Sequence, residues 1–201
     1  MKLIKNLTLG AFLFAFVSNV SAQDNSGNSN SGFGIKGGLN YATVSKGKFE
    51  EGPDPRTTFH IGFLGEVELL PNVLSLQPEV LYSRQGFENT VQPLIGSSYK
   101  VTYKFDYVNV PVLAKLHIGK VLSVEAGPQF GLKVSETIES ENGSSMEDQL
   151  NDFDTAIAAG LSLKFNQGVF IYGRFTQRLN EVVKDSDSKN MVVQVGLGFK
   201  M

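Results

Sequence analysis

A chain of 201 residues, of which 41% are hydrophobic and 19% charged, suits one all-β barrel or sandwich, or at most two small domains. Its net charge of −2, without a basic block, argues against nucleic acid as a partner. The absence of cysteine excludes a disulfide framework, a thiolate metal site, a cysteine nucleophile and a lipid anchor on an N-terminal cysteine.

Residues 1–22 have the three regions of a secretory signal peptide. Lys2 and Lys5 give a positive start, an apolar core follows over Leu7–Val17, and small residues at Val20–Ala22 suit a cleavage site. Because this core is too short to span a bilayer, we expect it to be removed rather than to anchor the chain.

The chain then divides into a leader and a long region of alternating character. Residues 23–32 are rich in Asn, Ser and Gly and are predicted to be flexible, whereas residues 33–201 alternate between apolar and polar or small side chains. This period of two is typical of β-strands. Eight strands are predicted, at about 33–43, 57–70, 73–86, 99–118, 121–136, 152–165, 169–180 and 191–201.

The fourth strand contains a change of phase. Its apolar residues are odd-numbered over 99–107 and even-numbered over 108–116, which predicts a bulge near Tyr107–Val108. Proline removes a hydrogen bond from a sheet and favours edges or bulges. Prolines inside the third, fourth and fifth strands therefore suggest local bulges at Pro78, Pro111 and Pro128.

Short and long connections alternate along the chain. The short turns are predicted at residues 71–72, 119–120 and 166–168. The long, polar connections are predicted at residues 44–56, 87–98, 137–151 and 181–189. An up-and-down barrel with both termini at one end has this asymmetry, as outer-membrane barrels do.

The polar face of the strands is crowded with small residues, which a narrow lumen requires and a solvated surface does not. They are Gly34, Gly38, Gly62, Gly127, Gly131, Ala156, Ala158, Gly160, Ser162, Gly196 and Gly198. Basic and acidic residues also fall on this face. They are Lys36, Arg84, Lys115, Lys133, Lys164, Arg174, Glu66, Glu68, Glu79, Glu125 and Asp154. We expect these charges to pair inside the barrel, because an unpaired buried charge is very costly.

Aromatic residues near strand ends suit the two girdles of a membrane barrel: Phe33, Tyr41, Phe59, Tyr82, Phe153 and Phe199. The sequence therefore predicts an all-β fold, an eight-stranded antiparallel up-and-down transmembrane β-barrel in the bacterial outer membrane. Its own side chains would fill the lumen. A secreted, lipocalin-like barrel that binds an apolar ligand is the alternative, but it would need its bulky residues inside.

Residues 107–116, with an aromatic residue, a central Pro111 and Lys115, resemble a segment of the outer-membrane β-barrel proteins of the Bacteroidetes, often called porin family proteins. The runs at 34–40, 172–175 and 196–200 are similar to that family too. The resemblance implies a barrel like the small OmpA/OmpX-type proteins, and its motifs identify a fold rather than an activity.

Few residues suggest chemistry. Residues 32–37 match Gly-x-Gly-x-x-Gly, but no helix is expected after them, so they are interpreted as strand glycines. His60 and His117 fall on the polar face, where a Ser-His-acid cluster for an outer-leaflet lipid A-modifying enzyme is conceivable, although no spacing singles out a set. Packed lumen histidines are the favoured interpretation.

Two sets of acidic residues could form acid–base or cation sites. Glu66, Glu68 and Glu79 could converge from adjacent strands, although salt bridges to Lys36, Arg84 or Lys115 are favoured. The connection over 136–152 carries six acids that could bind a divalent cation, but its spacing does not match an EF-hand loop: Glu136, Glu139, Glu141, Glu147, Asp148 and Asp152.

We therefore assign no catalytic, cofactor-binding or metal-binding residue. The predicted role is structural, or it is binding or adhesion through the long loops 44–56, 87–98, 137–151 and 181–189. The expected partners are outer-membrane lipids and an unknown protein or surface ligand, and the expected state is a monomer.

Overall fold

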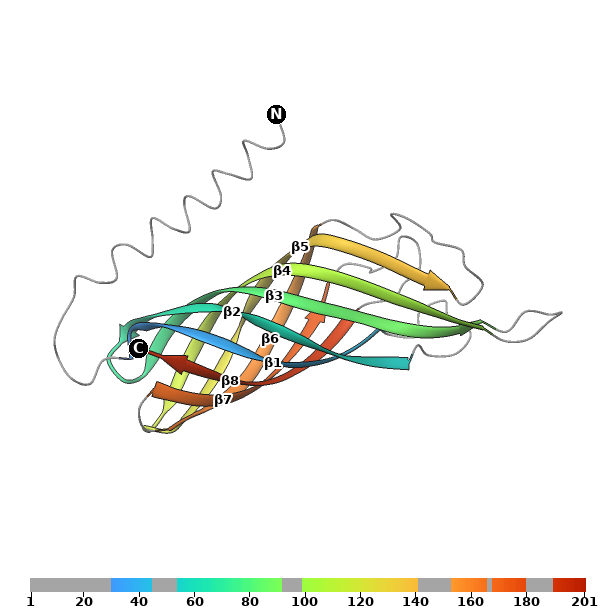
Figure 1. Cartoon of the computed structure of the whole chain (residues 1–201). Coiled ribbons are helices and arrows are strands. Elements are labelled where there is room, and N and C mark those ends of the chain that lie inside the picture. Colours follow the sequence, from blue (N-terminus) through green and yellow to red (C-terminus); the bar gives the residue numbers. More distant parts are fainter. Residues whose placement is uncertain (1–29, 45–53, 92–98, 141–152, 166–167, 180–189) are drawn as a thin grey trace, which may run out of the picture.

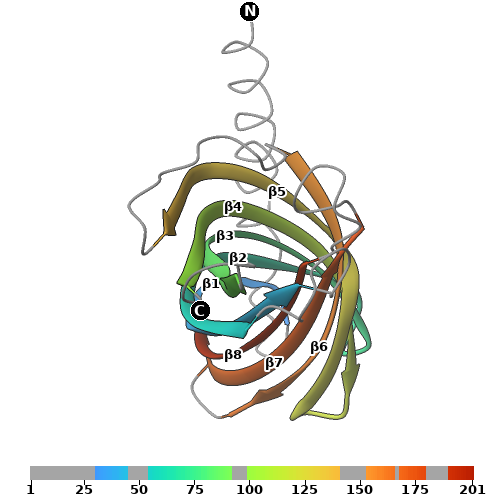
Figure 2. The ribbon, with the colours of Figure 1, turned by 90° about the vertical axis from the view of Figure 1, so that its right-hand side faces the viewer.

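The computed structural model describes residues 30–44, 54–91, 99–140, 153–165, 168–179 and 190–201. Within them eight antiparallel strands close into one barrel, in which β1 pairs with both β2 and β8 (Figures 1 and 2). The strands are β1 (Gly32–Val44), β2 (Asp54–Leu70), β3 (Leu74–Val91), β4 (Tyr99–Ile118), β5 (Leu122–Ser140), β6 (Phe153–Lys164), β7 (Val169–Arg178) and β8 (Asn190–Lys200). The predicted fold class is confirmed, whereas the signal peptide over 1–22 lies outside the described residues.

The short turns gather at the end of the barrel where the C-terminus lies (Figure 1). Each contains one residue in the left-handed region, with φ of 57° at Asn72, 70° at Gly119 and 82° at Gly168. Asparagine and glycine adopt this conformation at the lowest cost, which explains why these residues mark the turns. We call this end the turn end, and we call the opposite end, where β1, β3, β5 and β7 end, the outer end.

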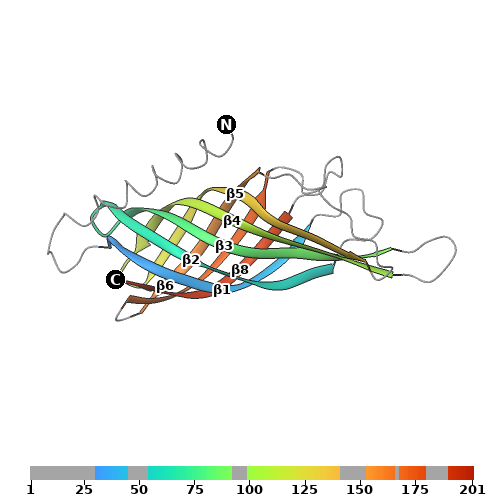
Figure 3. The same ribbon diagram turned by 45° about the horizontal axis from the view of Figure 1, so that its top comes forward.

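Four neighbouring strands project beyond the others at the outer end (Figures 1 and 3). β2 to β5 contain 17, 18, 20 and 19 residues, whereas β6, β7 and β8 contain 12, 10 and 11. Residues 54–56, 87–91 and 137–140, predicted to belong to long connections, are therefore strand. We call the projecting portions of β2 to β5 the extension.

The wall of the barrel is apolar on its outer face and polar on its inner face. On β8, for example, Val193 and Val195 are 44% and 62% exposed, whereas Gln194 between them is 3% exposed. Large apolar side chains are similarly exposed on all eight strands. An outward apolar belt around a polar interior is the arrangement that a membrane-spanning barrel requires. No helix in the described residues is long and apolar enough to cross a membrane.

The predicted change of phase in β4 is wrong. Phe105 and Tyr107 are each 1% exposed and share the inner face with Asn109, so β4 keeps a single alternation. The bulge lies instead in β5, where Asp106 pairs with Ser135 but Tyr107 pairs with Lys133, leaving one extra residue between them. The outer end thus has apolar residues inside, because there the interior must be filled while the outside faces water.

The three strand prolines do not cause bulges. The β4–β5 register is the same on both sides of Pro111 and Pro128, and the β3–β4 register is the same on both sides of Pro78. Residues beside these prolines drop out of the pairing, since proline lacks the N–H group that a rung needs. A closed barrel with long strands therefore tolerates isolated missing rungs without shifting its strands.

Candidate functional site

The middle of the lumen is closed by ion pairs that join opposite walls. The Arg174 guanidinium on β7 donates from Nη1 to Glu79 on β3 at 2.7 Å and from Nε to Glu125 on β5 at 2.9 Å. Lys36 on β1 reaches the same Glu79 carboxylate at 3.2 Å, and Gln77 donates to it at 2.6 Å. The Arg174 and Glu79 side chains are fully buried, so this cluster fills the lumen rather than lining a channel.

A second charged cluster lies toward the turn end. The Glu66 carboxylate accepts from Lys200 at 2.6 Å and from Lys115 at 3.4 Å, and it lies 3.0 Å from His117 Nε2. Lys115 also donates to Gln77 at 2.9 Å, which links this cluster to the one in the middle. The predicted pairing of lumen charges is confirmed for these residues.

A third group of side chains closes the lumen toward the outer end. Arg178 forms an ion pair with Asp154 at 2.8 Å, donates to Gln85 at 3.1 Å and lies 3.9 Å from the centre of the Tyr107 ring. Closer to the outer end, buried Phe87 and Phe105 pack edge to face with ring centres 6.0 Å apart. Sequence reasoning missed both residues as lumen side chains. Phe87 fell in a predicted connection, whereas the signal for Phe105 was an apolar phase that disagreed with the rest of β4.

The two histidines do not form an accessible catalytic set. His117 Nε2 contacts both Ser75 Oγ at 2.8 Å and Glu66 at 3.0 Å, while Nδ1 lies 3.0 Å from Ser123 Oγ. A catalytic triad needs the serine and the acid on opposite ring nitrogens, and the serine must meet substrate. Ser75 shares its nitrogen with the acid, and Ser123 is 6% exposed inside the lumen, away from lipid.

His60 is a packed lumen residue. Its Nδ1 lies 2.7 Å from Asn40 Oδ1, and its Nε2 contacts the Tyr172 hydroxyl. Asn40 in turn accepts from Gln194 at 3.0 Å, so the ring belongs to a chain of polar contacts that crosses from β2 to β8. Both ring nitrogens are therefore occupied by neutral groups, Asn40 and Tyr172, in the part of the chain that the structure describes.

The three glutamates considered as a carboxylate cluster do not converge. Glu66 and Glu79 belong to different clusters, and Glu68 accepts from Asn30 at 3.2 Å and from the Asn72 backbone N–H at 2.5 Å. In the described ranges no group of three or more His, Cys, Asp or Glu side chains could hold a metal ion. Most of the acidic connection over 136–152, to which no metal site is assigned, lies outside these ranges.

Arg84 is outside the barrel, which corrects its assignment to the lumen. It pairs through Nε with Asp106 at 2.8 Å, and its side chain is 44% exposed. The next outward residue on β3 toward the turn end is Tyr82, whose ring packs against Phe59 at 6.2 Å. This ion pair therefore marks the point at which the apolar belt ends and the water-exposed extension begins.

Comparison with known families gives one match over most of the chain. A family model described as "Outer membrane protein beta-barrel domain" matches residues 21–184. No curated protein matches the sequence.

Solved structures share the fold at low sequence identity. The crystal structure of Ail, the attachment invasion locus protein of Yersinia pestis, is 15% identical, covers 85% of this chain and 99% of its own, and gives a TM-score of 0.53. Neisserial surface protein A is 14% identical, with coverage of 85% and 98% and a TM-score of 0.56. Ail was also solved in complex with the heparin analogue sucrose octasulfate, with a TM-score of 0.51 to this chain.

Proposed function

Because this chain belongs to the outer membrane protein β-barrel domain family and therefore resides in the bacterial outer membrane, we propose that it binds an external partner at its outer end and acts neither as a pore nor as an enzyme. The observation that carries this proposal is the closed lumen. Arg174, Glu79, Glu125 and Lys36 join four strands across the barrel axis and are buried. With the interior filled, the surfaces left for interaction are the belt and the two ends.

The extension supports recognition at the outer end. It carries β2 to β5 past the belt, and its outward residues include the Arg84–Asp106 and Lys100–Glu88 pairs. Its interior contains the aromatic residues Phe87 and Phe105, which give it a core of its own. A rigid, projecting sheet with a polar outer surface is suited to present binding loops, since loops on a rigid scaffold commonly carry function.

The charge of the connecting segments favours a cationic partner. Segments 45–53, 92–98, 141–152 and 180–189 together contain nine acidic and four basic residues. Opposite charge steers association and penalises wrong partners. A sulfated sugar of the kind seen with Ail would be repelled by these acidic segments, so we do not expect this chain to bind that ligand.

This charge preference predicts opposite behaviour for two probes. Full-length protein in neutral lipid vesicles should bind a fluorescent oligolysine peptide and should not bind sucrose octasulfate. The quadruple variant Glu141→Gln, Glu147→Gln, Asp148→Asn and Asp152→Asn should weaken oligolysine binding by about tenfold, because four of the nine acids are neutralised. Fluorescence anisotropy measures the binding of each probe. High salt should weaken oligolysine binding, because salt screens the charges.

A control removes one acid at the opposite end of the barrel. Glu68→Gln changes one carboxylate near the turn end, on the opposite side of the membrane from the probe. It should leave oligolysine binding unchanged. Binding of sucrose octasulfate, or equal binding of oligolysine by wild type and quadruple variant, would contradict recognition through the acidic segments.

The absence of enzymatic activity is part of the same proposal. The serines that contact His117 face the sealed interior, whereas an enzyme acting on lipid A needs its nucleophile at the lipid-facing wall or the outer end. A lipocalin-like ligand cavity has no support either, because the described lumen is filled by polar clusters together with buried side chains such as Leu64, Leu81 and Leu113. Membership of the Bacteroidetes type and the monomeric state stay predictions.

A further inference from the structure

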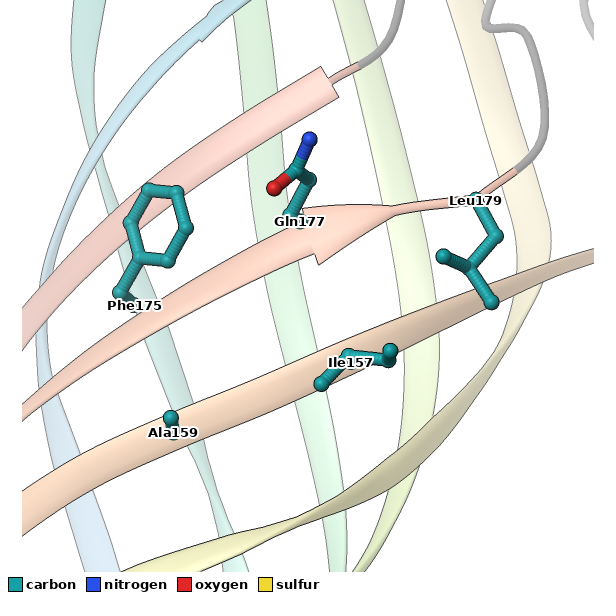
Figure 4. A pocket seen from close by; sticks show the side chains of 5 residues that line it. All are labelled: Ile157, Ala159, Phe175, Gln177 and Leu179. Atoms are coloured by element: carbon teal, nitrogen blue, oxygen red, sulfur yellow. The ribbon is translucent and has the colours of Figure 1, made fainter.

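A shallow apolar groove crosses the outer face of β6 and β7. Its volume is about 150 Å³, and it is lined by Ile157, Ala159, Phe175, Gln177 and Leu179 (Figure 4). Ala159 pairs with Phe175 and Ile157 pairs with Gln177, so the five residues form one continuous patch across two strands. Ala159 forms the floor of the groove. Its side chain is smaller than those of Ile157 and Phe175 beside it, so it leaves space that a leucine would fill.

The groove is continuous with the apolar belt and lies in its outer part. Ile157, Phe175 and Leu179 are 54%, 43% and 50% exposed on the lipid-facing wall. β7 starts at Val169 beside the turn end. A strand rises about 3.3 Å per residue and is tilted by about 40° from the barrel axis. Gln177 therefore lies about 20 Å from Val169 along that axis, toward the outer end. In an apolar band about 25 Å tall, this height corresponds to the outer leaflet near its polar boundary.

Gln177 is unusual for its position. It is exposed on the outward face of β7, between Phe175 and Leu179, and no hydrogen bond joins its side chain to another described residue. A primary amide offers two donors and one acceptor, and leaving such a group unpaired in hydrocarbon is costly. A lipid that supplies hydrogen-bonding groups at this depth would therefore be retained in preference to one that does not.

From this combination we propose that the groove binds one acyl chain of an outer-leaflet lipid, whose amide or ester linkage hydrogen-bonds to Gln177. The acyl chain lies over Ala159, between Ile157 and the side chains of Phe175 and Leu179. An amide linkage matches Gln177 best, because it can both donate to and accept from a carboxamide. This site is separate from the outer-end recognition proposed above and depends only on the membrane location.

A second copy of the chain fits the groove less well than a lipid does. Stable protein interfaces bury about 1,200–2,000 Å² in total, whereas this groove is a small depression lined by five residues on two strands. The strands around it present the same convex, aliphatic wall as the remainder of the belt. A single flexible chain can follow such a depression, but a convex barrel wall cannot enter it.

The test uses full-length protein in phosphatidylethanolamine nanodiscs, titrated with lipid A as a probe that has both amide- and ester-linked chains. Native mass spectrometry should show one lipid A retained per barrel. Ala159→Leu, which fills the floor, and Gln177→Leu, which removes the amide, should each reduce retention by about fivefold. All variants should remain heat-modifiable on a gel, because the changes lie on the lipid-facing surface.

Ala114→Leu is the matched control, since Ala114 is also an exposed alanine on the lipid-facing wall but lies on β4, outside the groove. It should retain lipid A as the wild type does. Equal retention in all four proteins, or an equal loss in Ala114→Leu, would overturn the proposal in favour of unspecific lipid contact. Disulfide-linked dimers of Gln177→Cys that form in place of lipid retention would overturn it in favour of a second copy.

Discussion

Replacing Arg174 by alanine should lower the free energy of unfolding of the barrel by about 3–5 kcal/mol. The change leaves Glu79 and Glu125 buried without the guanidinium that they share at 2.7 and 2.5 Å. Removing one partner of a buried ion pair lowers stability by more than the intact pair contributes, because the remaining charge is buried without water or a counter-charge. Urea unfolding of the protein in lipid vesicles, followed by the loss of the heat-modifiable band, measures the change.

Two variants separate this effect from a loss of packing. Arg84→Ala breaks an arginine–carboxylate pair of similar geometry, at 2.8 Å, but on the exposed extension. Its cost should stay below about 1 kcal/mol, because water replaces the lost partner. Adding Glu79→Gln to Arg174→Ala should recover part of the stability. Equal costs for Arg174→Ala and Arg84→Ala would show that the lumen is hydrated and open.

Replacing Gly198 by valine should lower the free energy of unfolding by about 3 kcal/mol or prevent assembly. Gly198 pairs with Phe170 on β7, and a Cβ atom at Gly198 would lie 2.1 Å from the tip of the Phe170 ring. Phe170 is 7% exposed and packs in the same cluster as Tyr172 and Leu64, so it has little room to move. The same unfolding assay, with outer-membrane yield, checks this result.

Gly173 is the matched control because it lies on the neighbouring β7 but faces outward. A Cβ atom there meets nothing within 4 Å. Gly173→Ala should therefore leave stability unchanged or raise it slightly, since alanine reduces the conformational freedom of the unfolded chain. Adding Phe170→Leu to Gly198→Val should relieve part of the clash, because it removes the ring that lies over Gly198. A Gly198→Val barrel as stable as the wild type would show that the ring does not lie over this glycine.

Periodicity was sufficient to predict the strands within the membrane. β4 has the predicted range, Tyr99–Ile118, and β8 pairs with β1 and β7 as an up-and-down barrel requires. The inward position of Lys36 and Glu79 also follows from alternation, because both residues lie opposite apolar neighbours that face lipid. These predictions succeed because the membrane imposes one rule, apolar outside, along the whole belt.

The same rule fails beyond the membrane, where the outside of the barrel faces water. Alternation groups Phe105 and Tyr107 with the lipid-facing residues because they are apolar, yet they fill the interior of the extension. Arg84 was placed inside because it is charged, yet it lies outside, where water solvates it. Alternation shows which residues share a face, but the surrounding medium decides which face is buried, and the sequence does not mark where the membrane ends.

The partners inside the lumen could be predicted only as a set. Sequence alternation identifies the inward charges, but barrel closure and stagger decide that Arg174 meets Glu79, 95 residues away, and that His117 meets Glu66. Register depends on all eight strand pairings together. The groove at Ala159 is likewise invisible in the sequence, because its depth depends on side chains from two strands.

The closed lumen is tested most directly by planar-bilayer recording of the purified, full-length protein. Three groups of contacts, centred on Arg174, Glu66 and Arg178, cross the interior from the middle to both ends. The recordings should therefore show no stable conductance steps above those of the bilayer alone. Stable, large steps that require the folded, heat-modifiable protein would contradict a barrel filled by its own side chains.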